Sequence, residues 1–130
     1  MEDITVNVGA DDDDSPAVFD DSVILEQTEG DREFAKELAQ IFIDSSELLL
    51  NEIDESFVRN DASTLQRAAH SLKGSVGNFG APEVWQAAEE LELLAERNDL
   101  AGAGESLKVL KQRIAGLVDG LRLYISGASS

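Results

Sequence analysis

Only one histidine, His70, and no cysteine occur among the 130 residues of this chain. The absence of cysteine excludes a Cys nucleophile, a disulfide framework, a Cys-ligated zinc site and an iron–sulfur cluster, and a lone histidine excludes a multi-histidine metal site. Any histidine chemistry must therefore use the imidazole of His70, which is a nucleophile when it is neutral and accessible. A lone histidine in a helical segment is more often a buried residue or a surface residue without a function. Whether His70 has a chemical role must therefore be judged from the residues around it.

The helical register predicts that His70 faces solvent. The apolar stripe of its segment consists of four residues, Leu65, Ala69, Leu72 and Val76. His70 lies about 100° round the helix from Ala69, on a face that it shares with Gln66, Gly74 and Gly77. A glycine inside a helix costs roughly 1 kcal/mol relative to alanine, so two of them beside His70 indicate access for a bulky group such as another protein. The alternative is that Gly77 frays the helix end and Gly74 permits a close helix contact.

Basic side chains flank His70 in a stretch without acids. Residues 62–82 contain no carboxylate, and Arg67 and Lys73 lie three residues before and after the histidine. Such cations stabilise a phosphoryl group attached to an imidazole, with Lys73 as the main candidate and Arg67 as further electrostatic support. A solvated basic edge of the helix remains the alternative.

A carboxylate is expected opposite His70 on the next helix. If the two helices form a hairpin centred near Ala81, positions that average 81 face each other, and the mate of position 70 is Glu92. A carboxylate that accepts a hydrogen bond from the ring Nδ1–H fixes the tautomer and leaves Nε2 as the nucleophile. Other glutamates of the same segment leave an ordinary solvated acidic face as the competing interpretation.

The elements that position these residues are all predicted to be helices. From Ala17 onward apolar residues recur with helical period, and no stretch shows the sustained alternation of a strand. We expect a short helix around residues 21–29 and longer ones over 31–59, 62–79 and 82–97, with Gly80 as a stop. The last helix should follow a turn at 98–104. Short connections between such helices predict an all-α, antiparallel up-down four-helix bundle with a short extra N-terminal helix covering one end.

The 31–59 helix is the longest and most regular of these. Its buried stripe is expected to consist of nine residues, Phe34, Leu38, Ile41, Phe42, Ser45, Leu48, Leu49, Ile53 and Phe57.

Composition indicates one acidic domain that binds proteins. The chain has 27 acidic and 10 basic residues, a net charge of −17, and 42% hydrophobic residues, enough for a core. This charge argues against nucleic acid and against an anionic membrane surface. Residues 1–16, with six acids and no bases, are expected to be a disordered tail or linker, residues 17–126 the bundle, and residues 127–130 a frayed end. Without a membrane-spanning run or a signal peptide, we expect a cytoplasmic location and no direct membrane contact.

The segment AAHSLKGSVGNFGA, residues 68–81, resembles the HxxKGxxxxxG signature of histidine-containing phosphotransfer (HPt) domains. His70, Lys73, Gly74 and Gly80 occupy its fixed positions, and the similarity extends over most of residues 20–125. The resemblance implies a four-helix bundle whose exposed histidine accepts a phosphoryl group from a receiver-domain aspartate and passes it to another. Carried over, Lys73 stabilises the phosphoryl group, and Glu92 takes a position where some members have glutamine; a carboxylate there would repel phosphate.

The same resemblance implies partners and limits. The partners would be receiver domains of response regulators or of hybrid histidine kinases, and the magnesium ion needed for transfer would belong to the receiver. The domain would need no cofactor, would lack kinase and phosphatase activity of its own, and would be a monomer, either standing alone or within a hybrid sensor kinase anchored in a membrane. Two alternatives are an acidic helical interaction module without phosphotransfer, and the dimerising phosphoacceptor part of a histidine kinase, which an ATP-binding domain should follow.

Overall fold

The computed structural model describes residues 19–127, and within them every regular element is helical. The elements are α1 (Asp21–Gln27), α2 (Arg32–Val58), α3 (Ala62–Val76), the 3-10 turn η2 (Gly77–Phe79), α4 (Pro82–Glu96) and α5 (Leu100–Ser126). The predicted acidic tail, 1–16, and residues 128–130 lie outside the described part of the chain. Gly127, the first residue of the predicted frayed end, is the C-cap of α5.

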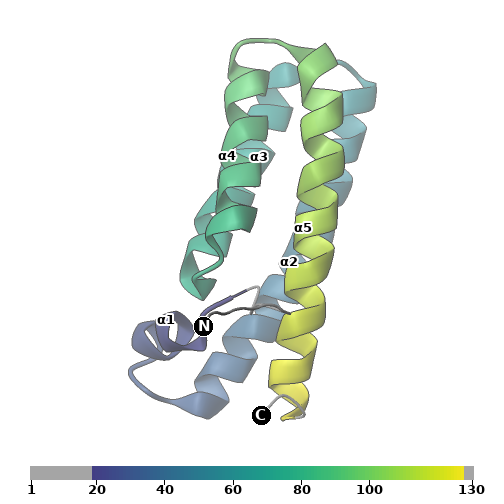
Figure 1. Cartoon of the computed structure of the whole chain (residues 1–130). Helices are drawn as coiled ribbons and strands as arrows, with labels where there is room; N and C mark the ends of the chain where they lie inside the picture. The colour runs from purple at the N-terminus through teal and green to yellow at the C-terminus, as the bar shows by residue number, and fades with distance from the viewer. Residues whose placement is uncertain (1–18, 128–130) are drawn as a thin grey trace, which may run out of the picture.

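The four longer helices form the predicted antiparallel bundle, so the expected fold class is confirmed (Figure 1). Each helix packs on its neighbour in the chain, and α5 closes the bundle against α2. Helices α2 and α5 have 27 residues each and α3 and α4 have 15 each, which makes them about 40 and about 22 Å long. The long pair therefore extends past the turn between α3 and α4, and α1 lies beyond that turn (Figure 1).

Aspartates begin four of the helices. The carboxylates of Asp20, Asp31, Asp61 and Asp99 each accept a hydrogen bond from a backbone N–H in the first turn of the helix that follows. Such N-caps satisfy one of the amides that a helix start leaves unpaired and are worth about 1 kcal/mol each. They fix where α1, α2, α3 and α5 begin, and the Asp61 cap thereby sets the start of α3, the helix that carries His70. Helix α4 has no such cap and begins at Pro82 instead.

Gly80 ends the α3–η2 segment as predicted, and it also makes room for α1. Its φ of +61° is a left-handed conformation that suits glycine, and a Cβ there would lie 2.8 Å from side-chain atoms of Asp20 and Val23. The backbone N–H of Asp20 donates to the carbonyl oxygen of Phe79 at 3.0 Å. Gly80 thus anchors the beginning of α1 at the turn of the α3–α4 hairpin.

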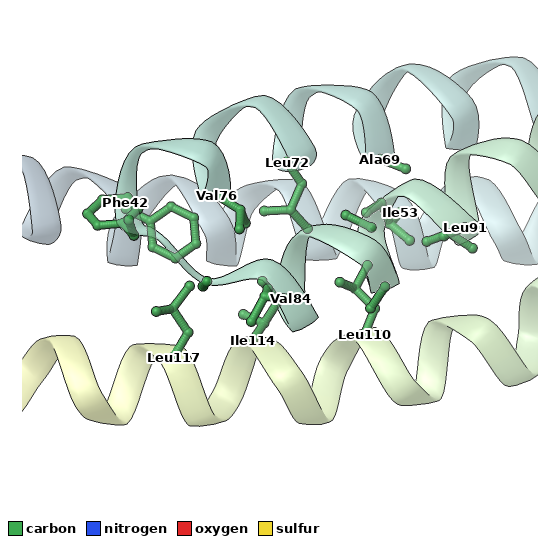
Figure 2. Close-up of a cluster of buried hydrophobic side chains, with 14 of the residues drawn as sticks. Phe42, Ile53, Ala69, Leu72, Val76, Val84, Leu91, Leu110, Ile114 and Leu117 are labelled. Carbon is green, nitrogen blue, oxygen red and sulfur yellow. The ribbon is translucent and has the colours of Figure 1, made fainter. Parts of the chain in front are cut away.

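Side chains from all four long helices meet in one continuous core (Figure 2). The stripe predicted for the His70 segment is confirmed, because Leu65, Ala69, Leu72 and Val76 are completely buried. Their burial turns the opposite face of α3 outward.

Two details of the predicted elements are wrong. Phe34, Ile41 and Leu48 of the expected α2 stripe are 47, 60 and 70% exposed. The buried face of α2 is instead made by seven residues, Ala35, Ala39, Phe42, Ile43, Ser46, Ile53 and Ser56. Four of these seven have small side chains, namely Ala35, Ala39, Ser46 and Ser56, and a count of large apolar residues does not detect them.

The turn predicted at 98–104 is also too long, because α5 already begins at Leu100. Gly102 and Gly104 therefore lie inside the helix. The Asp99 cap starts the helix, and Gly104 lies so close to α2 that a Cβ there would be 3.3 Å from the Phe57 ring. Elsewhere in the chain, residues 28–29 and 77–79 fall just outside the regular α-helices that were expected to include them.

Candidate functional site

His70 lies in the middle of α3 with its side chain 66% exposed. The register that buries Leu72 and Ala69 leaves no other direction for the imidazole than outward. The nucleophile candidate is therefore held on a rigid, regular helix and is open to a partner.

Gly74 and Gly77 leave open space beside the imidazole. A Cβ added to either glycine would meet no atom within 4 Å among the described residues. Gly74 therefore does not serve a close helix contact, which was the alternative explanation. Gly77 does mark the end of α3, but its φ of −58° is one that any residue adopts. The packing of this domain does not require glycine at either position. The missing side chains therefore indicate that a partner molecule approaches this face of α3.

Glu92 joins the two polar groups of the site. Its Oε2 is 2.9 Å from His70 Nδ1 and its Oε1 is 2.8 Å from Lys73 Nζ. Because the Glu92 side chain is only 14% exposed, both contacts are shielded from water. With the proton on Nδ1, the imidazole donates to Glu92 and presents a free lone pair on Nε2 toward solvent.

The charges of Glu92 and Lys73 support each other. Burial alone would raise the pKa of the Glu92 carboxyl, but the hydrogen bonds from Lys73 and His70 hold this pKa below its usual value. The hydrogen bond to Glu92 in turn raises the pKa of Lys73. At neutral pH the site therefore contains an ammonium and a carboxylate, both ionised.

Lys73 has a second neighbour that sequence reasoning missed. Its Nζ lies 5.3 Å from the centroid of the Trp85 ring, and its side chain is only 19% exposed. A signal was present in the sequence, because Trp85 precedes Glu92 by seven residues, which is two turns of one helix face. The two α4 residues thus approach Lys73 from the same side.

Arg67 and Gln66 lie on α3 but are less closely tied to the site. The Arg67 guanidinium donates to the Thr64 hydroxyl at 3.3 Å, one turn away from His70 rather than toward it. Gln66 is half-buried on α3. The structure therefore brings together His70, Lys73 and Glu92 and leaves Arg67 on the edge of the site.

Within residues 19–127, no group of three or more His, Cys, Asp or Glu side chains could hold a metal ion. None of the described helices is long and apolar enough to cross a membrane.

The Hpt domain family matches residues 37–120, so the chain belongs to this family. A curated relative, the phosphorelay intermediate protein rdeA of Dictyostelium discoideum, is 28% identical over 96 residues, which are 74% of this chain and 38% of rdeA. The chain thus spans less than half the length of that relative. The match thus shows membership of the Hpt domain family, and the role of a phosphorelay intermediate is the one named for rdeA.

Solved structures agree with this fold. The histidine-containing phosphotransfer protein B from Pseudomonas aeruginosa PAO1 superposes with a TM-score of 0.80 at 25% identity, covering 88% of this chain and 98% of that one. The HPT domain of a hybrid histidine kinase from Shewanella superposes with a TM-score of 0.74 at 18% identity, again over 88% and 98% of the two chains.

Proposed function

We propose that His70 is the phosphoacceptor and that its Nε2 attacks the acyl phosphate of a docked receiver domain. The Nε2–P bond forms as the P–O bond to the receiver aspartate breaks, and that aspartate leaves as a carboxylate. The reverse sequence hands the phosphoryl group to a second receiver. The observation that carries this proposal is the exposed imidazole with Nδ1 held 2.9 Å from a shielded carboxylate.

Lys73 is the cation that stabilises the transferred group. Its ammonium is bound to the same carboxylate as His70, so it lies near the phosphorus without blocking Nε2. Arg67 adds a more distant positive charge. The remaining catalytic groups, including a magnesium ion, are assigned to the receiver, and the domain is a carrier without kinase or phosphatase activity of its own.

The exposed apolar stripe of α2 is the best docking surface for the receiver. Phe34, Ile41 and Leu48 repeat every seven residues, so they lie on one exposed face of α2, the helix that packs against α3. Exposed apolar side chains beside a glycine-lined face are typical of a protein interface. We assign this surface, with Gly74, Gly77 and Gln66, to receiver domains of response regulators or hybrid kinases.

The wider context follows from the same proposal. A carrier that exchanges phosphoryl groups with receivers works in the cytoplasm as a monomer, either alone or as one module of a hybrid sensor kinase. Neither nucleic acid nor a membrane surface is expected among its direct partners, given its net charge of −17.

The test is phosphoryl transfer from a receiver charged with a small phosphodonor, followed by intact mass. Wild type should gain one phosphoryl group that is labile in acid and stable in alkali. His70→Gln should fold with an unchanged Tm and stay unlabelled. Stoichiometric labelling of the variant would exclude His70 as the acceptor. If several receivers bind without transferring to wild type, the domain is an interaction module without phosphotransfer.

A further inference from the structure

Lys73 is held unusually firmly for a surface lysine. Its side chain is 19% exposed, whereas that of Lys108 on α5 is 75% exposed. A free lysine loses about 2 kcal/mol of rotamer entropy when it is fixed in one geometry. At this site much of that ordering has taken place before any phosphoryl group arrives.

Two groups from α4 hold the ammonium. The Glu92 carboxylate binds it at 2.8 Å, and the face of the Trp85 indole lies 5.3 Å away, within the range of a cation–π contact. The carboxylate alone would attract the ammonium, but the lysine side chain could still adopt other rotamers that place the ammonium in solvent. The ring restricts that movement because it lies against the ammonium and is itself packed on the core.

The position of Trp85 is fixed by the start of α4. Pro82 is the first residue of the helix, and the Trp85 N–H donates to the Ala81 carbonyl oxygen at 3.0 Å, which closes the first turn. The indole therefore does not depend on a mobile loop. The ring also lines an open cleft of about 330 Å³ together with Gly77.

We propose that Trp85 is a positioning residue of the phosphotransfer site and acts through Lys73: its ring and the Glu92 carboxylate hold the ammonium beside His70 in advance. This inference rests on the proposed function, because it takes His70 as the carrier. When a phosphoryl dianion is attached to His70, the ammonium has only to turn from Glu92 toward it. Trp85 acts on the phosphoryl group only through this ammonium.

The lifetime of phosphorylated His70 tests this role without a receiver. Phosphoramidate can label the imidazole directly with release of ammonia, and the loss of the label is followed by intact mass at neutral pH. Trp85→Leu should shorten the lifetime about two- to fivefold, the range of one exposed cation–π contact. Trp85→Phe, which keeps an aromatic face, should restore most of it. The Tm of each variant shows that the bundle is intact.

A double-mutant cycle separates positioning from a merely structural effect. If Trp85 acts through Lys73, Trp85→Leu should change nothing further in a Lys73→Met background. An equal shortening in both backgrounds, or no shortening in the wild-type background, would overturn the role of Trp85. If neither phosphoramidate nor a receiver labels His70, the proposed function fails, and the positioning role falls with it.

Fluorescence offers a second readout, since Trp85 is the sole tryptophan of the chain. Lys73→Met should change the emission spectrum of the unphosphorylated domain. The matched control is Lys111→Met, which removes a 2.8 Å pair with Asp54 between α5 and α2 and should leave the emission unchanged. Phosphorylation should change the emission of wild type but not that of Lys73→Met. Identical spectra for wild type and Lys73→Met would contradict the contact on which the proposal depends.

Discussion

A side chain at Gly74 should stabilise the domain and at the same time slow transfer from a receiver. The position lies inside α3, and a Cβ there meets no atom within 4 Å. Alanine should therefore gain about 0.8–1.0 kcal/mol of unfolding free energy from helix propensity without a clash. For a domain of this size that gain raises the Tm by about 4 °C. Thermal and urea unfolding of Gly74→Ala measure it directly.

Function should respond in the opposite direction, and more strongly to a longer side chain. Gly74→Gln keeps a good helix former but fills the space beside His70, so transfer from a phosphorylated receiver should fall well below that of Gly74→Ala. Labelling by phosphoramidate should stay close to wild type, because a small donor needs no docking surface. The assay is the rate of phosphoryl transfer with each donor.

Gly116 provides a matched control. It lies inside α5, away from α3, and a Cβ there also meets no atom within 4 Å. Gly116→Ala and Gly116→Gln should give a similar stabilisation and leave transfer with both donors unchanged. If Gly74→Gln accepts phosphoryl groups from a receiver as fast as wild type, the idea that the glycine keeps the approach open is refuted. A loss of stability in Gly74→Ala would refute the packing argument.

Three further outcomes are expected. Lys73→Ala should shorten the phosphohistidine lifetime or slow transfer while the circular dichroism spectrum stays unchanged; no change in either rate would remove Lys73 from its role. Gly80→Ala should lower the unfolding free energy by more than about 1 kcal/mol in urea titrations, because it combines a left-handed φ with atoms of Asp20 and Val23 only 2.8 Å from the new Cβ. The low folded-state pKa of Glu92 means that its ionic contribution is present above the unfolded pKa, near 4.3, and is lost as the pH falls through the folded pKa. The stability difference between wild type and Glu92→Gln should therefore shrink between pH 7 and pH 3, and a constant difference in unfolding experiments would contradict this assignment.

Local patterns were sufficient to predict the parts of the site that lie on α3 and α4. The core stripe of α3 determines the direction of His70, and the short connection at Gly80 determines which α4 residue faces it. The direction of His70 and the identity of the residue opposite it both depend on helix geometry alone. Glu92 could therefore be placed opposite His70 from the sequence. The contact of 2.9 Å agrees with that placement.

The parts that could not be predicted depend on packing between segments far apart in the sequence. Helix α2 contacts both α3 and α5, and the small residues Ala39 and Ser46 are part of its buried face. Hydrophobicity ranks Ile41 and Leu48 above them, although both face solvent. The contact between Lys73 and Trp85 likewise depends on side-chain directions that spacing alone does not provide.

The pairing of Lys73 with Glu92 has a consequence for how tightly the domain can hold its cargo. The two opposite charges cancel at 2.8 Å, so an arriving phosphoryl dianion meets no surplus positive charge at the site. It must compete with an existing carboxylate for a single ammonium, on a chain whose net charge is −17. The bound state is therefore a shallow minimum in free energy rather than a deep one. A shallow minimum suits a phosphoryl carrier, because a weakly held phosphoryl group can be transferred to either of two receiver domains.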